Sequence, residues 1–208
     1  MPNDVVDATE HLLGMADRFR PIRVDLARAG DRHFTFSAGV GLDAAVVERV
    51  DAHAYRKARF GEWYFTWTAL GTFNRRFLVN PPRVRATAGG RSVDGVTVIV
   101  QNSDPYSYFG KRPLYICDDS SPINGRLSAA VLKRATPLEM PTLIPRILSG
   151  RPGAVGRHRQ IESLPDLKTL RVESIDGKTF PLQLDGDYIG EFDEIEFGVQ
   201  PAGLAVVS

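Results

Sequence analysis

The chain has 208 residues, of which 43% are hydrophobic and 25% charged, and its formal net charge at pH 7 is +1. This composition is typical of a globular protein and gives no overall attraction to nucleic acid or membranes. The single cysteine, Cys117, excludes an internal disulfide and a multi-cysteine zinc site. No apolar run reaches the ~20 residues that span a bilayer and no signal-peptide pattern begins the chain, so we expect a cytoplasmic protein.

The first forty residues predict a helix and a β-hairpin. Residues 1–13 have apolar side chains at helical spacing, after polar residues that can cap a helix. Ile22–Ala27 alternates between apolar and polar residues, and His33–Ala38 returns after a turn as a second strand. Because so short a helix needs a partner surface, we expect residues 1–20 to be the remnant of a connection to an absent N-terminal domain.

A glycine-rich stretch at Gly39–Ala44 (G-V-G-L-D-A) lies between a predicted strand and a predicted helix. This order is the outline of a dinucleotide-binding fingerprint. The fingerprint also needs a second parallel strand that ends in an acidic residue about 20 positions later. The pattern of residues 51–73 is helical instead, so we reject a Rossmann fold and expect the glycines to permit a tight turn.

The segment Tyr55–Leu78 is the most aromatic part of the chain, and cations flank it. Such a helix can lie on an anionic membrane, with its rings at the headgroups and its cations on phosphates. Packing of the same helix in a protein core is an equally good interpretation. The flanking cations are Arg56, Lys57, Arg59, Arg75 and Arg76.

The remainder of the chain predicts mainly strands. They are Arg83–Thr87, Gly95–Gln101, Arg126–Lys133, Lys168–Ser174, Thr179–Leu184, Glu194–Val199 and Leu204–Val207. Gly95–Gln101 is apolar enough to be central in a sheet, and Leu138–Leu148 predicts a helix. Asn102–Arg112 is a loop rich in turn formers and tyrosines, of the kind that often carries binding groups. The pattern predicts an α+β fold, a β-rich sandwich or pair of sheets with inserted helices.

The sequence Asp185-Gly186-Asp187 follows the strand predicted over Thr179–Leu184. Asp-Gly is the strongest short-range turn signal, so Asp187 is expected directly beyond a turn. A carboxylate at a strand end is held rigidly, which is what a general base needs. Considered alone, D-G-D is more often a polar hairpin turn.

Four stretches, in this order, resemble the C-terminal domain of bacterial diacylglycerol kinases, the family that includes the sphingosine kinases. They are F-S-A-G-V-G-L-D-A-A-V-V (Phe36–Val47), V-I-V-Q-N-S-D-P-Y-S-Y-F-G-K-R (Val98–Arg112), P-I-N-G-R-L-S (Pro122–Ser128) and L-D-G-D-Y-I-G-E (Leu184–Glu191). No single stretch is specific, but the ordered set covers nearly the whole chain. The resemblance implies a lipid kinase that uses ATP and magnesium to phosphorylate a lipid hydroxyl.

Within this resemblance, Asp185-Gly186-Asp187 corresponds to the family's D-G-E, whose acid acts as the base on the lipid hydroxyl. The implied catalytic residues are Asp187, as the base, and Asp185. The family's D-G-x-x-D, a source of carboxylates near its metal, corresponds to Asn124-Gly125-Arg126-Leu127-Ser128, in which both acids are absent. Asn and Ser are weak ligands for a hard cation, so no metal ligand is predicted.

The family's nucleotide motif, G-G-D-G-T, does not occur in this sequence. The resemblance therefore implies one acceptor-side domain over residues 1–208, inactive alone. Its partners would be a lipid substrate, an anionic membrane surface at the inner face, and a nucleotide-binding domain in cis or in trans. Nucleic acid is not an expected partner. A non-catalytic lipid-binding or regulatory module, favoured by Asn124 and Ser128, is the alternative, and a structural domain of a complex is a third.

Overall fold

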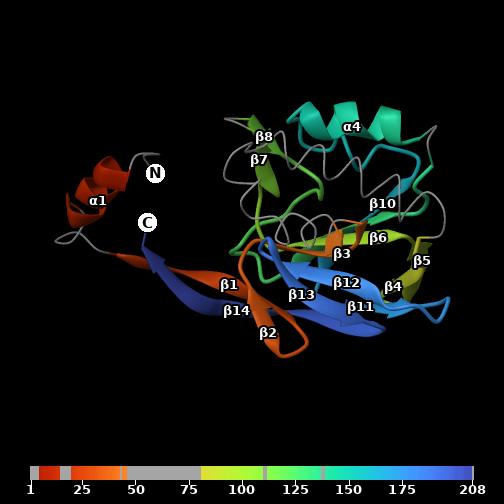
Figure 1. Cartoon of the computed structure of the whole chain (residues 1–208). Coiled ribbons are helices and arrows are strands. Elements are labelled where there is room, and N and C mark those ends of the chain that lie inside the picture. The colour runs from red at the N-terminus through yellow and green to blue at the C-terminus, as the bar shows by residue number, and fades with distance from the viewer. Residues whose placement is uncertain are drawn as a thin grey trace.

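The computed structural model describes residues 5–14, 20–42, 44–45, 81–109, 112–136 and 139–207. Two six-stranded sheets lie face to face, and helix α4 (Met140–Leu148) lies outside the second sheet (Figure 1). All the described strand pairs are antiparallel. The predicted fold class, a β-rich α+β sandwich with inserted helices, is confirmed, and so is the helix predicted near Leu138–Leu148.

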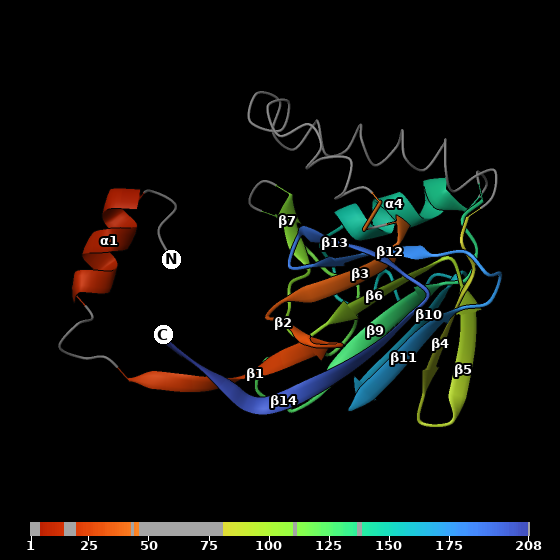
Figure 2. The same cartoon turned by 60° about the horizontal axis from the view of Figure 1, so that its bottom comes forward.

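The first sheet has the strand order β2-β1-β14-β11-β4-β5. Its strands are β1 (Pro21–Ala29), β2 (Arg32–Phe34), β4 (Val84–Ala88), β5 (Arg91–Gly95), β11 (Thr169–Ser174) and β14 (Glu194–Val207). β1 pairs with β14 from Pro21 opposite Val207 to Ala29 opposite Phe197. The first and last described strands, β1 and β14, are therefore neighbours in one sheet (Figure 2).

The second sheet has the strand order β10-β9-β6-β3-β12-β13. Its strands are β3 (Ser37–Gly41), β6 (Thr97–Gln101), β9 (Leu127–Leu132), β10 (Ile161–Leu167), β12 (Phe180–Leu184) and β13 (Asp187–Phe192). β6 has neighbours on both sides, so its predicted central position is confirmed. Buried apolar side chains fill the space between the sheets, including Phe34, Val84, Leu170 and Phe197 from the first and Val40, Val98, Leu127 and Leu182 from the second.

The prediction of one strand over His33–Ala38 is wrong. The chain leaves the first sheet after Phe34 and enters the second at Ser37, so Thr35 and Phe36 form a corner between the two sheets. Phe34 is buried and packs edge-on against Phe197, whereas Phe36 is 59% exposed. The alternation of residues continues through the corner, which is why the sequence pattern conceals the break.

The strands differ from the prediction in three further ways. The expected loop Asn102–Arg112 contains strand β7 (Ser107–Phe109), which pairs with β8 (Arg112–Leu114). The two last predicted strands are a single strand, β14, with a register shift opposite Asp25. Strands β5, β10 and β13 were not predicted, because polar residues or a proline interrupt their apolar pattern.

The rejection of a dinucleotide fingerprint at Gly39–Ala44 is confirmed. Strand β3 is antiparallel to both of its neighbours, β6 and β12, whereas the fingerprint belongs to a parallel sheet. The aromatic segment Tyr55–Leu78 and its five flanking cations lie outside the described residues.

Helix α1 (Val5–Gly14) confirms the predicted N-terminal helix and stands apart from both sheets in both views (Figures 1 and 2). Val5, Val6 and Leu13 are at least 65% exposed. None of the described helices is long and apolar enough to cross a membrane.

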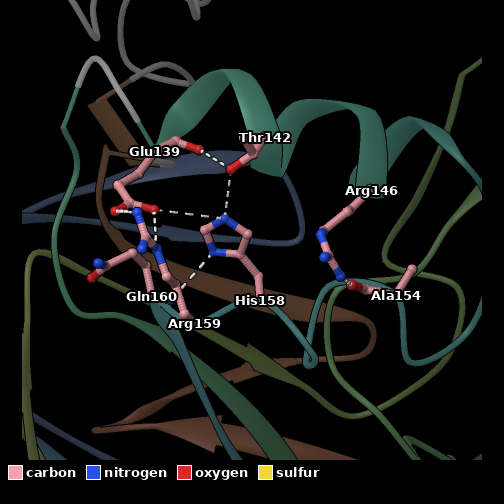
Figure 3. A network of polar contacts seen from close by, with 7 residues as sticks. All are labelled: Glu139, Thr142, Arg146, Ala154, His158, Arg159 and Gln160. Carbon is pink, nitrogen blue, oxygen red and sulfur yellow. Dashed lines mark hydrogen bonds and ion pairs between the residues drawn. The ribbon is translucent and has the colours of Figure 1, made fainter.

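A polar network that includes the buried Glu139 and His158 ties helix α4 to the segment before β10 (Figure 3). The Gln160 N–H donates to His158 Nδ1 (3.2 Å), so the neutral ring carries its proton on Nε2, 2.9 Å from Thr142 Oγ1. The Thr142 hydroxyl donates to the Glu139 carbonyl (2.7 Å). The Glu139 carboxylate pairs with Arg159, whose hydrogen bonds lower the pKa of Glu139.

We expect protonation of His158 to destabilise the fold in mild acid. Burial lowers the pKa of His158, with the Arg146 and Arg159 cations acting in the same direction and Glu139 opposing them. The unfolded chain therefore binds more protons at His158 than the folded chain does. The contribution of neutral His158 to the free energy of unfolding is fully present above about pH 6.5, the pKa of histidine in the unfolded chain. It is lost as the pH falls below that value.

Thermal melts of the wild type and of His158→Gln between about pH 7.5 and 5.5 measure this effect, since the range spans the unfolded pKa. The difference in stability between the two proteins should narrow as the pH falls. His33→Gln, at an exposed position of β2, is the control and should keep the pH dependence of the wild type. A difference in melting temperature between the wild type and His158→Gln that stays constant over this pH range would contradict the expectation.

Candidate functional site

The stretches that carried the resemblance meet at one end of the second sheet. In the strand register Ser37 lies opposite Gln101, Gln101 opposite Ser128, and Leu184 opposite both Ala38 and Asp187. Strands β3, β9 and β13 therefore begin where β6 and β12 end. We call this end of the sheet the motif end; it comprises Thr35–Ser37, Gln101–Asp104, Pro122–Ser128 and Leu184–Asp187.

The predicted turn at Asp185-Gly186 is confirmed as the connection between β12 and β13. Asp185 has φ +50° and Gly186 has φ +92°, the pair of positive values that a type I′ hairpin turn requires. Asp and Gly accept positive φ more readily than other residues, which is why the sequence gives this turn so clearly. The buried Gln183 side chain also accepts the Gly186 N–H (2.9 Å) and holds the turn at the strand end.

The Asp185 carboxylate is bound to the corner between β2 and β3. One oxygen accepts the Thr35 N–H (2.7 Å) and the Thr35 hydroxyl (2.8 Å). The other accepts the N–H groups of Phe36 (2.8 Å) and Ser37 (3.0 Å). The Asp185 N–H donates in return to the Ser37 carbonyl (2.8 Å). With four donors on its two oxygens, Asp185 has its acceptor capacity filled by the protein itself.

Asp187, two residues further on, has different surroundings. It is the first residue of β13, its side chain is exposed, and no described residue donates a hydrogen bond to its carboxylate. Its oxygens are therefore open to a group that approaches from solvent. The two acids of the D-G-D sequence are both exposed but differ in their hydrogen bonds, since Asp185 accepts three backbone N–H groups and a hydroxyl, whereas no described residue donates to the Asp187 carboxylate.

Two further polar residues at or beside the motif end, Asn102 and Asp25, were not selected as site residues from the sequence. Asn102 is completely buried, and its Nδ2 donates to the carbonyls of Thr35 (3.0 Å) and Asp25 (3.0 Å). The Asp25 carboxylate, 4% exposed, accepts the N–H groups of Gly125 (2.6 Å) and Ala202 (2.9 Å). Asp25 occupies an ordinary polar position in an alternating strand, so no local signal marks it.

The stretch that corresponds to the family's metal acids does not fit a metal ion in this chain. Asn124 is exposed, and its Oδ1 accepts the Arg126 N–H (2.9 Å) of its own turn. Ser128 is buried inside β9. Within the described part of the chain, no group of three or more His, Cys, Asp or Glu residues could hold a metal ion.

Cys117 lies near the motif end but is an unsuitable nucleophile. Its N–H donates to the buried Gln101 side chain (2.8 Å), and its Sγ lies 3.6 Å from the Ile99 carbonyl. Burial raises the pKa of the Cys117 thiol well above its usual value, and nearby Asp104 and Asp118 act in the same direction. The thiol therefore stays protonated and serves as a small core side chain.

Comparison with known families decides the affiliation of the chain. Residues 36–208 match the family described as "YegS C-terminal NAD kinase beta sandwich-like domain". The chain belongs to this family. The matched range includes all four parts of the motif end apart from Thr35, and the resemblance stated from the sequence is confirmed at the level of the family.

Solved structures of the same fold come from Bacillus anthracis str. Sterne. A "putative diacylglycerol kinase" superposes with a TM-score of 0.68 at 19% identity, covering 98% of this chain and 61% of that one. Another with the same description gives a TM-score of 0.62 at 18% identity, with the same coverage. A diacylglycerol kinase structure gives 0.55 at 14% identity, covering 98% and 58%. At these identities the likeness establishes the fold, and the chain spans less than two thirds of each structure. No curated protein matches the chain.

Proposed function

We propose that this YegS-type domain is the acceptor-side domain of a lipid kinase that transfers phosphate from ATP to a lipid hydroxyl. The observation that carries the proposal is the geometry of the D-G-D turn, which leaves Asp187 exposed, with no donor to its carboxylate among the described residues. The descriptions of the Bacillus anthracis structures of the same fold suggest diacylglycerol as the acceptor class. Those structures are longer than this chain, and a nucleotide-binding domain in cis or in trans is part of the proposal.

In the proposed reaction, Asp187 acts as the general base. A lipid hydroxyl within about 3 Å of the carboxylate gives its proton to Asp187 as its oxygen attacks the γ-phosphorus of ATP, and ADP leaves. The backbone of Asp187 is held by the β12–β13 hairpin, since Asp187 is paired with Leu184. Its side chain is shorter by one methylene than a Glu, so the hydroxyl must approach the strand end more closely.

The nucleotide partner supplies the remaining chemistry. ATP would supply the phosphoryl group. Magnesium would supply positive charge that offsets the negative charge of the phosphoryl oxygens during transfer. Because Asn124 and Ser128 do not fit a metal ion, no step of the proposed mechanism in this domain involves one. An anionic membrane surface at the inner face of the membrane is the proposed location of the lipid.

A non-catalytic lipid-binding or regulatory module is the second candidate. The specific observation in its favour is the pair Asn124 and Ser128, which stand where the family pattern has acids. In this role the domain would bind lipid without taking part in phosphoryl transfer.

A phosphate-transfer assay separates the two candidates. Vesicles that contain diacylglycerol are incubated with radiolabelled ATP and magnesium, and with the chain alone or fused behind a nucleotide-binding domain of the same family. We expect labelled lipid only with the fusion. Label with the chain alone would place a nucleotide site within these 208 residues. Vesicle binding by both proteins without any label would favour the non-catalytic module.

A further inference from the structure

A chain of hydrogen bonds joins two loops of the motif end that are distant in sequence. At one end, the β12–β13 turn is held by Asp185, which accepts four hydrogen bonds from the corner Thr35–Ser37. At the other, the loop Pro122–Gly125 is held by Asp25. The Asp25 N–H donates to the Pro122 carbonyl (2.6 Å), and its carboxylate accepts the Gly125 N–H.

Among the side-chain hydrogen bonds of the described residues, those of Asn102 link both halves of this chain of bonds. Its N–H donates to the Phe36 carbonyl (2.9 Å), and its Nδ2 donates to the carbonyls of Thr35 and Asp25. Its Oδ1 is buried and has no partner among the described residues. A buried amide oxygen without a hydrogen-bond partner lowers the stability of the folded state. The two hydrogen bonds donated by Nδ2 must therefore stabilise the fold by more than this loss. They also fix the orientation of the amide, because the reverse would set Oδ1 against two carbonyl oxygens.

We infer that Asn102, together with Asp185 and Asp25, positions the β12–β13 turn and thereby the Asp187 carboxylate. Asp185 anchors the turn to the corner, Asn102 holds the corner to β1, and Asp25 holds β1 to the loop that contains Asn124. Asn102 touches no reacting atom. It acts through its neighbours, so it is a positioning residue, and its role in catalysis rests on the proposed function. The same logic assigns Asp185 to positioning, since its acceptor capacity is filled by Thr35–Ser37.

The physical reason for such a network is the short reach of Asp187. A displacement of a reacting group by ~1 Å can cost ~100-fold in rate. A hairpin turn that is held only by its own two strands can move relative to the rest of the sheet. The β12–β13 turn is held in addition by the hydrogen bonds between Asp185 and the corner Thr35–Ser37, which restrict this movement. The coupling also means that a change in loop 122–125 is transmitted to the turn, although 60 residues separate Gly125 from Asp185.

Amide hydrogen exchange of the 208-residue chain tests the coupling without any need for activity. In Asn102→Ala, we expect exchange to accelerate by about tenfold, equivalent to the loss of one hydrogen bond, at both ends of the network. The diagnostic amides are Phe36 and Ser37 at one end and Gly125 at the other. Thr142→Val removes a partly buried hydrogen bond between α4 and His158, away from the motif end, and is the matched control. It should leave those three amides unchanged.

Acceleration at one end only, or an equal acceleration across both sheets, would overturn the inference. If Asn102→Ala fails to fold, Thr35→Val provides the second variant, because it removes only the hydroxyl bond to Asp185. It should accelerate the same three amides by about two- to threefold, as expected for the loss of one solvent-exposed hydrogen bond. No acceleration at Gly125 in that variant would also contradict the coupling.

A kinetic measurement on the fusion kinase separates positioning from simple loss of fold. Asn102→Ala should lower kcat by about tenfold or more while KM for diacylglycerol changes by less than about twofold, because the base is displaced and the lipid contacts remain. An unchanged kcat with accelerated exchange would overturn the catalytic part of the inference. Absence of labelled lipid with the wild-type fusion would instead overturn the proposed function. In that case the hydrogen-exchange result would still show whether Asn102 couples the two ends of the network.

Discussion

Replacement of Asp187 by asparagine in the fusion kinase is expected to lower turnover by about 100-fold or more, as for loss of a general base. Asparagine keeps the shape of the side chain and removes its basic oxygen. Binding of the domain to vesicles with diacylglycerol should persist, because Asp187 lies at the surface and no described residue depends on its carboxylate. Turnover from radiolabelled ATP and a vesicle sedimentation assay measure the two effects.

Asp193→Asn is the matched control for this variant. Asp193 is another exposed carboxylate and follows β13 directly, but it lies at the opposite end of that strand from Asp187. Its substitution removes the same charge and should leave turnover close to that of the wild type. Near-normal turnover in Asp187→Asn, or an equal loss in the two variants, would refute the assignment of Asp187 as the base.

The largest effect on stability is expected for Gly95→Ala. Gly95 ends β5 where the chain passes from the first sheet to the second, and it is buried. An added Cβ would lie 2.6 Å from Val131 Cγ1 and 2.7 Å from the Leu132 carbonyl oxygen. Since backbone cannot move aside as a flexible side chain can, we expect a loss of about 3 kcal/mol, or about 6–12 °C in Tm.

Gly198→Ala provides the comparison for Gly95→Ala. Gly198 is also buried in a strand, but its added Cβ would meet only Arg28 Nη2, at 3.8 Å, an ordinary contact. Its stability should stay within about 0.5 kcal/mol of the wild type, the usual range for a substitution without a clash. Thermal and denaturant melts of the two variants check both values, and similar losses in the two would show that steric clash at Gly95 is not the cause.

The sequence predicted those parts of the fold that local patterns determine. Gly95–Gln101 was expected as a central strand because its apolar residues are continuous, and Asp185-Gly186 as a turn because both residues accept positive φ. Strand β5 escaped prediction because R-S-V-D-G forms an edge strand with few apolar residues. The corner at Thr35–Phe36 escaped because alternation continues through it.

The candidate site was predictable only in part. Asp187 and Asp185 could be selected from a turn signal and a family resemblance, which also gave the order of the four stretches. The different surroundings of the two acids could not be predicted, because the donors to Asp185 lie about 150 residues earlier in the chain. Asp25 and Asn102 depend in the same way on contacts with distant residues, and a single sequence records no such contact.

The pairing of the first strand with the last has a consequence for the order in which the protein forms. β1 cannot pair with β14 until β14 has been synthesised. Asp185 likewise cannot accept the hydrogen bonds of Thr35 until the residues that follow β12 have left the ribosome. Structures dominated by such distant pairings fold slowly, because the entropy of closing a long loop is lost before the contacts form. We therefore expect the edge of β1 to stay unpaired in the nascent chain during translation. The motif end should be among the last regions of the domain to fold. Until then, the unpaired strand edges are exposed to aggregation.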